Sequence, residues 1–580
     1  MNENITIKNE RVDDIPLLLS QIEKMQVGDL LDQYFPTHGN WQGLSLSQVT
    51  SVWLSFILSE ANHRLSHVQP WVEQRLEMLT TCLSIPIRSL DFTDDRLALI
   101  LDNLSKESAW IDFEKALTQN IVRVYDMKTH QVRIDSTTAK GYVQVTPEGL
   151  FQFGHSKDHR PDLPQIKINM SALDPPGLPV STTIVAGHCA DDPLYVLEIK
   201  RVQNSLERHG LTYMGDSKMA VLKTRAFIVD SKDFYLCPLT DVQVRNTQWE
   251  QLLWPVDNRI EPLVPVYRQN GENDKPEKIA EGYESQVCLI EEVDGNTIKW
   301  IERRLIIRSL KFAQSQERAL RTRIDRALSA ISALNERKQG KKRFSDEEQL
   351  RTAAEQIVSK YRVTDLIHLE ITTDITERIV RQYKNRPGRI VQEKDVRIKA
   401  SIDETALNKA IEPLGWRVYV TNHSEKELSL EQAVLAYRAE YLVERGFGRL
   451  KGKPLSLTPM YLDTNERVTG LIRLLTIGLR VLTLLEFCVR KQLKEEEGKL
   501  AGIYPGNPKR ATARPTAEMM LRAFEGVTLT VIKQGDKVYR HLTPLSKVQQ
   551  RILELLGLSS DIYLQLSQHF LEPTINLSEP

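Results

Sequence analysis

The most apolar part of this 580-residue chain is VTGLIRLLTIGLRVLTLLEFCV, residues 468–489. An apolar run of this length is buried either in a membrane or in a protein core. Three charged residues, Arg473, Arg480 and Glu486, interrupt the run, and an intramembrane Arg costs about 2.5–3.5 kcal/mol on insertion scales. The run therefore predicts a buried helix in the core of a large protein, and no membrane partner is expected.

The length and the charge balance bound the possible architectures. A chain this long predicts two to four domains. Lys and Arg total 77 and so do Asp and Glu, so a polyanion-binding protein must segregate its charge locally. The five cysteines form no C-x-x-C pair and the N-terminus has no signal pattern. These features predict a reduced, cytoplasmic chain without structural zinc.

Hydrophobic periodicity divides the chain into five regions. Residues 1–118 read as a helical N-terminal domain, either a DNA-binding module or a plain packing domain. Residues 119–239 switch to strands at 122–127, 131–138, 163–173, 178–187, 211–217 and 233–239, with a helix at 192–210, which is typical of an α/β layer.

The remaining regions are an insert, a return to the α/β pattern, and a tail. Residues 240–405 read as an inserted domain, with a hairpin turning at Asp294-Gly295 and helices at 310–338 and 345–360. Residues 406–502 resume the pattern with a strand at 415–422 and helices at 436–451 and 466–493. Residues 503–580 read as a linker and a mainly helical C-terminal region.

Two acidic residues stand at the ends of predicted strands. Asp135 lies in RIDSTT and Asp216 in YMGDSKM. If these strands are neighbours, the carboxylates converge, and a third carboxylate from a packed helix would complete a site for two Mg²⁺ or Mn²⁺ ions. The alternatives are that Asp135 is a turn residue and that Asp216 caps the following helix.

The segment AYRAEYLVERGFGRLKGK, residues 436–453, carries two helical stripes. Val443, Phe447 and Leu450 belong to an apolar stripe that predicts core packing. Glu444 and Lys451 belong to a second stripe, roughly 100° around the helix, that would border a cleft. The alternative is a solvated charged face.

These residues resemble the transposases of bacterial insertion sequences of the insertion-sequence-four type, in the subgroup with an extra N-terminal helical domain. Their signature is Y-x-x-R-x-x-x-E-x-x-x-x-x-x-K, which Tyr437, Glu444 and Lys451 match, while Glu440 replaces the Arg. RIDSTT and GDSKM resemble the segments that carry the two catalytic Asp residues. GYVQ and FQFGHSKDHRPDLPQIKI, which follow the first of these, resemble the same subgroup, and the motifs cover about 130–450.

The resemblance implies a ribonuclease-H-like core interrupted by an inserted α+β domain. It implies a metal-binding catalytic triad of Asp135, Asp216 and Glu444 that holds two Mg²⁺ ions, for which Mn²⁺ substitutes. The implied activity is strand cleavage at the transposon ends and strand transfer into target DNA, by a homodimer in a synaptic complex in the bacterial cytoplasm at the nucleoid. The expected DNA-contacting residues are Tyr437, Lys451, Arg445, Lys218, Lys157 and Arg160.

Local charge agrees with a DNA partner. Residues 303–343 contain 13 Lys or Arg against three acids, and 377–399 is also basic, although a solvated charged helix is the alternative reading. Two other functions stay open: a catalytically decayed protein that still binds DNA, and a nuclease of this fold without strand transfer.

Overall fold

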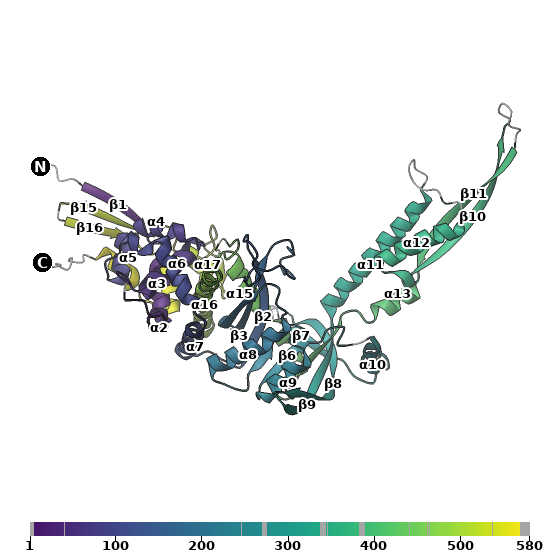
Figure 1. Ribbon diagram of the computed structural model, residues 1–580, viewed down its shortest axis with the longest axis horizontal. Helices are drawn as coiled ribbons and strands as arrows, with labels where there is room; N and C mark the ends of the chain where they lie inside the picture. The colour runs from purple at the N-terminus through teal and green to yellow at the C-terminus, as the bar shows by residue number, and fades with distance from the viewer. Residues whose placement is uncertain are drawn as a thin grey trace. The chain divides into compact units, whose positions relative to one another are not determined.

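The computed structural model describes residues 5–39, 41–244, 246–269, 275–336, 344, 346–381, 389–439, 441–460, 462, 464–535 and 537–568. Two compact units are present. Unit 1 consists of residues 1–237, 290–300 and 436–580, and unit 2 of residues 238–289 and 301–435. Unit 2 is therefore inserted into the sequence of unit 1, and the chain is a mixed α/β protein (Figure 1).

A mixed sheet carries the candidate site in unit 1. Its strands are β2 (Gln131–Lys140), β3 (Gln165–Leu173), β4 (Leu178–Ala186), β5 (Thr212–Met214) and β6 (Phe234–Pro238), in the order β4-β3-β2-β5-β6. Strands β2, β3 and β4 form an antiparallel meander, whereas β5 pairs in parallel with β2 and β6 in parallel with β5. Helices α8 (Asp192–Leu206) and α9 (Leu222–Asp230) are the two crossovers, as parallel pairing requires.

Helix α16 (Asn465–Glu495) is the centre of unit 1 and confirms the buried helix predicted from the apolar run. It is long and apolar enough to cross a membrane by composition, but 94% of its most apolar window is buried inside the protein. It packs on α3, α6, α17, α18 and β4, and Figure 1 shows α3 and α6 beside it. Its buried charges are paired: Arg473 with Glu107, Arg480 with Glu114, and Glu486 with three arginines.

The first 124 residues of unit 1 supply the helices around α16. They are α1 (Ile15–Lys24), α2 (Val27–Tyr34), α3 (Leu46–Glu60), α4 (Val68–Glu73), α5 (Leu76–Leu83), α6 (Asp94–Leu104) and α7 (Glu107–Val124). The last of these extends into the predicted strand at 122–127, so that prediction was wrong. Apolar residues at helical spacing, such as Trp110, Phe113, Leu117 and Ile121, extend the helix because their stripe is buried.

Both ends of the chain contribute to one small antiparallel sheet. Strand β1 (Ile5–Arg11) pairs with β15 (Thr528–Gln534), which also pairs with β16 (Lys537–Leu542). The C-terminal region is thus only partly helical, with α17 (Ala517–Arg522), α18 (Lys547–Leu556) and α19 (Asp561–Leu564), after the short pair β13 (Leu500–Ala501) and β14 (Ala511–Thr512). The sequence analysis did not predict β1, whose residues are mostly exposed and whose partner strand lies near the other end of the chain.

Unit 2 contains a sheet region and a helical region with a ribbon. The first has α10 (Asn246–Asp257), β7 (Val264–Arg268), most of β8 (Glu277–Val293) and β9 (Asn296–Ser309), and β12 (Trp416–Thr421), in the order β12-β9-β8-β7. Asp294 and Gly295 form the turn between β8 and β9, both with positive φ, as predicted. Helix α14 (Leu430–Arg438) ends this part of the chain.

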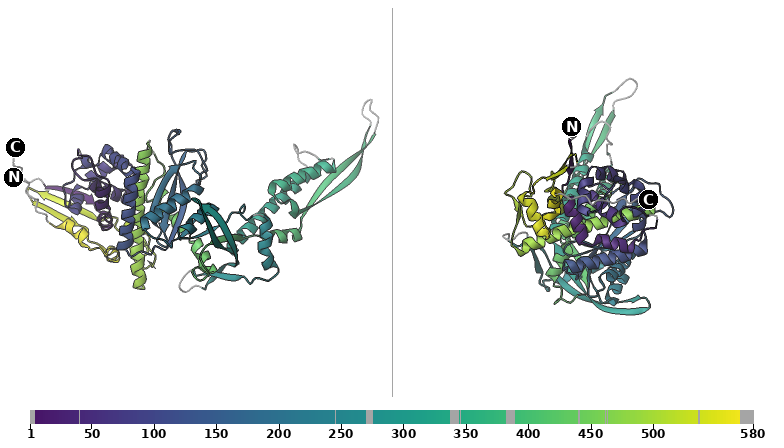
Figure 2. Two further views of the ribbon diagram at one scale, coloured as in Figure 1. Left: turned by 60° about the horizontal axis from the view of Figure 1, so that its bottom comes forward. Right: turned by 90° about the vertical axis from the view of Figure 1, so that its left-hand side faces the viewer.

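The second region of unit 2 has its own apolar core. Helices α11 (Leu310–Ser332), α12 (Glu347–Tyr361) and α13 (Glu404–Ile411) pack against the antiparallel strands β10 (Ile367–Val380) and β11 (Arg389–Ile402). The strands form a separate two-stranded ribbon, which continues beyond the ends of these helices in both views of Figure 2 and in Figure 1.

Two helical glycines provide a matched test of this packing. A Cβ at Gly470 would lie 2.1 Å from the Leu101 carbonyl oxygen, whereas one at Gly448 would meet nothing within 4 Å. We expect Gly470→Ala to destabilise unit 1 because backbone must move. Gly448→Ala should instead raise the free energy of unfolding by about 1 kcal/mol, the helix-propensity difference. Urea denaturation followed by circular dichroism measures both, and equal effects would contradict the packing of α6 on α16.

Candidate active site

The parallel register of β2 and β5 brings two carboxylates together. The pairing ends at Arg133 and Met214, two residues before Asp135 and Asp216, so both carboxylates follow the last paired position on their own segments. Neighbouring strands are about 4.8 Å apart, and the Asp216 charge contributes to the raised pKa of Asp135. Asp135 lies inside β2 rather than in a turn, and α9 begins only at Leu222. Asp135 is therefore not a turn residue, whereas Asp216 does not cap α9 but does accept the Lys218 backbone N–H in the turn at 217–220.

Asp135 is a largely buried carboxylate with a lysine beside it. Its side chain is 17% exposed, and Oδ1 lies 3.2 Å from Lys157 Nζ and accepts a bond from the Ser136 backbone N–H at 2.7 Å. Burial raises the pKa of Asp135, the Lys157 ammonium lowers it, and the Asp216 carboxylate raises it further. The net increase in pKa means that burial disfavours the ionised form more than the Lys157 ammonium favours it.

Asp216 is oriented by two donors. The Tyr195 hydroxyl, from α8, donates to Asp216 Oδ1 at 2.7 Å, and the Lys218 backbone N–H donates to the same oxygen at 2.8 Å. Burial raises the pKa of Tyr195 well above its usual value, and the Asp216 charge adds to this effect. Tyr195 is therefore a neutral donor at physiological pH, and it fixes the carboxylate without competing for a cation.

Helix α15 (Tyr441–Lys451) carries Glu444 along β2. Before its start, the Ala436 carbonyl accepts a bond from Arg133; at its end, Lys451 Nζ lies 3.4 Å from the Thr138 carbonyl oxygen. The helix therefore runs beside β2 in the same direction and passes Asp135. The expected single helix over 436–451 is interrupted, since α14 ends at Arg438. Glu440 lies outside the described residues.

A small hollow joins the elements of the site. It is lined by Arg133, Ile134, Asp135, Met214, Gly215, Tyr437 and Val443. Val443, Phe447 and Leu450 are buried, as the apolar stripe predicted, while Glu444 is exposed. The Glu444 carboxylate has no bond to another described residue, and it adjoins the hollow through Val443.

An ion-pair network fixes α15 to the central helix. Arg445 donates to both carboxylate oxygens of Glu486, at 2.8 Å to Oε2, and Arg449 bonds to Glu486 and, at 2.8 Å, to Glu518. Glu486 is only 6% exposed and also accepts the Ala517 backbone N–H at 3.0 Å. The rotation of α15, and with it the direction in which Glu444 projects, is set by these buried contacts.

The residues predicted to contact DNA surround this site, but most already have an acidic partner. Lys451 Nζ lies 2.7 Å from Asp158, Arg160 makes a two-bond contact with Asp162 at 2.8 Å, and Lys157 contacts Asp135. Arg445 is committed to Glu486, Tyr437 is buried in the hollow, and Lys218 is exposed. Their contact with DNA stays a prediction.

Sequence reasoning missed the residues that support the triad. Arg133 bonds to Asp174 at 2.8 Å and to the Ala436 carbonyl, and so connects β2 to the start of the helical segment. Its position two residues before Asp135, on the same face of β2, was the available signal. Tyr195 gave no such signal, because only the fold brings α8 to Asp216.

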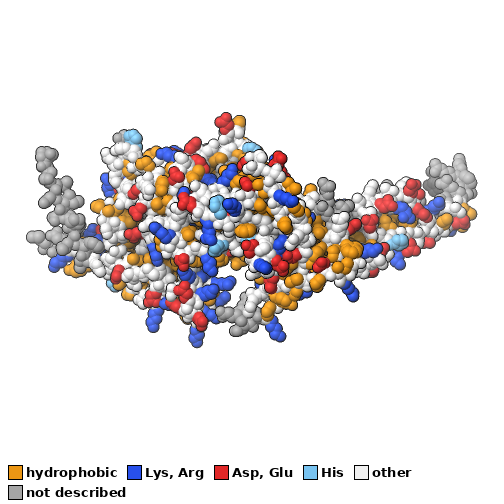
Figure 3. Space-filling model, turned by 90° about the horizontal axis from the view of Figure 1, so that it is seen from below, with side chains coloured by type: hydrophobic (Ala, Val, Ile, Leu, Met, Phe, Trp, Pro, Cys, Tyr) orange, Lys and Arg blue, Asp and Glu red, His pale blue; other side chains and the backbone are white. Residues whose placement is uncertain are grey.

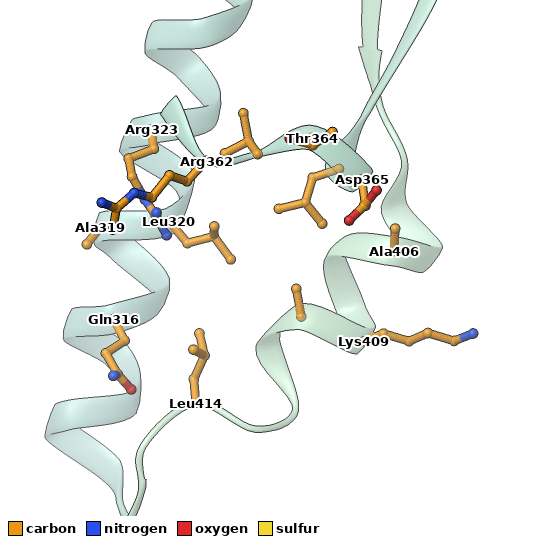
Figure 4. A pocket seen from close by; sticks show the side chains of 13 residues that line it. Gln316, Ala319, Leu320, Arg323, Arg362, Thr364, Asp365, Ala406, Lys409 and Leu414 are labelled. Atoms are coloured by element: carbon orange, nitrogen blue, oxygen red, sulfur yellow. The ribbon is translucent and has the colours of Figure 1, made fainter. Parts of the chain in front are cut away.

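The carboxylates do not form a closed metal site as they stand. Within the described part of the chain, no three His, Cys, Asp or Glu side chains come together as potential ligands of one ion. Unit 2 has a separate hollow, which is lined by α11, α13 and the residues that follow α12 (Figure 4). None of the predicted site residues lines it. The candidate site remains the end of the β2–β5 pairing, where the Asp216 charge acts on Asp135 and the helix of Glu444 packs on β2.

The raised pKa of Asp135 gives a prediction with a definite sign. A carboxyl group with a raised pKa in the folded state stabilises the fold only while protonated, and this contribution is lost as pH rises through the folded pKa. We expect Asp135→Asn to be more stable than wild type at neutral pH, with the difference vanishing below the unfolded value near about 3.9. Thermal unfolding as a function of pH measures this.

Asp162→Asn is the matched control. Arg160 lowers the pKa of Asp162, so its ionised form stabilises the fold above the unfolded pKa, and the Asn variant should lose stability at neutral pH. A loss of stability for Asp135→Asn at neutral pH would contradict the burial described here.

Comparisons with known proteins add little to this geometry. No protein-family model matches the chain, and no curated protein matches it. A solved structure described as the piggyBac transposase synaptic complex with hairpin DNA aligns with a TM-score of 0.32 and 7% sequence identity, over 90% of this chain and 81% of that one.

Proposed function

We propose that this protein is a metal-dependent DNA transposase. The observation that carries the proposal is that Asp135 and Asp216 each follow the paired ends of β2 and β5 by two residues, close enough for the Asp216 charge to raise the pKa of Asp135, while the helix of Glu444 packs on β2. The strand order, three antiparallel strands followed by two parallel ones, supports a ribonuclease-H-like core. The insertion of unit 2 between β6 and α15 supports the interrupted arrangement that the sequence motifs imply.

The donor set suits a hard divalent cation. Asp135, Asp216 and Glu444 offer carboxylate oxygens, the ligands that Mg²⁺ and Mn²⁺ prefer, and the Lys157 ammonium contacts Asp135 where positive charge is favourable. When bound, two such ions would stabilise the attacking and leaving oxygens of a phosphodiester. Tyr195 keeps Asp216 aimed at this edge through its hydrogen bond.

The proposed reaction has two steps. Water attacks the phosphodiester at the element's end, the P–O3′ bond breaks, and the strand is left with a free 3′-hydroxyl opposite a 5′-phosphate. That hydroxyl then attacks a phosphodiester of target DNA, or of the opposite strand; a new P–O3′ bond forms while the attacked strand's own P–O3′ bond breaks and leaves as a 3′-hydroxyl. Lys451 and Lys157, on the rim of the site, are placed to exchange their carboxylate partners for phosphate oxygens.

The test is cleavage of DNA taken from the genomic flanks of the gene, where inverted repeats are expected. We expect Mg²⁺- and Mn²⁺-dependent nicks that leave 3′-hydroxyls, no cutting in EDTA, and joined products with target DNA. Binding without cutting in either ion would support the second candidate, a decayed DNA-binding protein, for which the replaced Arg at position 440 is the motivating observation. Cutting without joining would indicate a nuclease.

A further inference from the structure

The connection between β2 and β3 contains a tight turn, residues 156–160, that lies against the proposed site. The carbonyl oxygen and the hydroxyl of Ser156 accept the backbone N–H groups of the last two residues of this turn, each at 3.2 Å. The Lys157 backbone N–H donates at 3.1 Å to the hydroxyl of Thr138, near the end of β2. The turn is therefore fixed to the strand that carries Asp135.

Two adjacent residues of the turn have opposite charges, and each is bonded to a residue of the proposed site. The Lys157 ammonium lies 3.2 Å from Asp135 Oδ1 and donates to the Ser136 carbonyl oxygen. The Asp158 carboxylate lies 2.7 Å from the Nζ atom of Lys451, at the end of α15. Among the described residues, these are the only ion pairs that Asp135 and Lys451 form. Two neighbouring residues thus neutralise both charges.

The two ion pairs imitate the groups that the proposed reaction would bring to the site. An ammonium bonded to a carboxylate and a carbonyl oxygen has the partners that a hard divalent cation takes, because both are compact cations with oxygen ligands. A carboxylate against a lysine ammonium has the partner that a phosphate oxygen takes, since both are anionic acceptors. Figure 3 shows Lys and Arg side chains interspersed with Asp and Glu over the face that it draws, so a phosphate that contacts a basic residue there must compete with nearby acids.

We propose that Lys157 and Asp158 occupy the cation and phosphate positions of the site until a divalent cation and DNA displace them. The exchange, which presupposes the proposed function, is feasible because both ion pairs are partly exposed: the side chains of Lys157 and Asp158 are 33% and 27% exposed, and such pairs are weak. Lys157 is repelled by a doubly charged cation at Asp135, and its long, flexible side chain is then free to contact a phosphate oxygen.

Acetylation of lysine side chains by an N-hydroxysuccinimide ester, followed by mass spectrometry, tests the displacement without DNA and without cleavage. An ammonium held in an ion pair must be released before it reacts. We expect Mn²⁺ to speed the acetylation of Lys157 in the full-length protein about fivefold, the factor that corresponds to an ion pair of about 1 kcal/mol. Lys128, which is exposed just before β2, should react at the same rate with and without Mn²⁺.

Asp135→Asn separates displacement from a general effect of the ion. In this variant Lys157 has lost its partner, so it should react fast in EDTA, and Mn²⁺ should leave its rate unchanged. The proposal is overturned if Mn²⁺ does not change the Lys157 rate in the wild-type protein, whether or not DNA is cut, or if Mn²⁺ raises the rate equally in Asp135→Asn. Release of Lys157 without any cleavage of DNA would reject only the proposed function.

Asp158→Asn tests the phosphate position through DNA binding in EDTA. Without this carboxylate Lys451 is free for phosphate, so the affinity for a short duplex of mixed sequence, measured by fluorescence anisotropy, should rise about fivefold. The gain should vanish when Lys451→Gln is already present. Glu148→Gln is the matched control, since it removes an exposed carboxylate from the same β2–β3 connection. Equal gains in Asp158→Asn and Glu148→Gln would overturn the assignment of Asp158 to the phosphate position.

Discussion

Asp135→Asn is expected to abolish strand cleavage, with a fall of more than about a thousandfold in the single-turnover rate. A carboxylate that holds a divalent cation supplies several kcal/mol of transition-state stabilisation, and each 1.4 kcal/mol is about tenfold in rate. Asn keeps the size of the side chain but loses the charge. Because the pKa of Asp135 is raised in the fold, the same substitution should increase stability, so lost activity would not reflect unfolding.

Substitution of the other two acidic residues, Asp216 and Glu444, should abolish cleavage as well. Asp216→Asn removes the charge that Tyr195 orients, and Glu444→Gln changes an exposed side chain without disturbing the buried Val443 beside it. DNA binding should persist in all three variants. Asp126→Asn is the control, since it is exposed and its left-handed backbone tolerates Asn. Full cleavage by any one of the three variants would remove that residue from the site.

Glu114→Leu is expected to have the largest effect on stability, a loss of about 3–5 kcal/mol. Arg480 is fully buried and its guanidinium bonds to Glu114 at 2.9 Å and to the Pro179 carbonyl at 3.1 Å. Removing Glu114 leaves a buried positive charge with no counter-ion. Denaturant unfolding followed by circular dichroism measures the loss.

Replacing both partners distinguishes the pair from simple packing. Arg480→Met with Glu114→Leu should be less destabilised than Glu114→Leu alone, because no unpaired charge remains buried. Asp162→Asn, which breaks the exposed pair with Arg160, should change stability far less. Equal losses in the single and double variants would show that the charge is not what makes Glu114 necessary. The pair matters for the site because Arg480 ties α16 to β4, in the sheet that carries Asp135.

The sequence predicted the sheet elements because their apolar alternation is strong and local. Strands β2, β3 and β4 and the turn at Asp294-Gly295 lie where periodicity and turn chemistry placed them. The two wrong secondary-structure predictions, at β1 and at 122–127, depend on contacts with residues far away in the sequence. Strand β1 pairs with β15 more than 500 positions later, and no window of sequence contains that information. The 122–127 segment alternates like a strand but its first residues end a helix.

In the candidate site, too, the local pattern predicted some features and only the fold shows the others. The pattern correctly predicted that Asp216 follows a strand, but Asp135, which was expected at the end of a strand, lies in the middle of β2. The motif spacing nominated Glu444. What the pattern could not supply is the parallel pairing of β2 with β5, which brings the segments of the two aspartates side by side, or the buried contacts of Glu486 that hold α15. Lys451 and Arg160 were predicted to contact DNA, and in the fold each forms an ion pair with an acidic residue.

The central claim is that Asp135, Asp216 and Glu444 hold the same metal ions, and iron-directed cleavage of the polypeptide tests it most directly. Fe²⁺ bound in place of Mg²⁺ produces hydroxyl radicals in the presence of ascorbate and peroxide, and these cut the backbone next to the ion. We expect three cuts, beside residues 135, 216 and 444, that disappear together when Mg²⁺ is added in excess and in Asp135→Asn. Cuts at only one of these positions, or at none of them, would contradict a shared metal site.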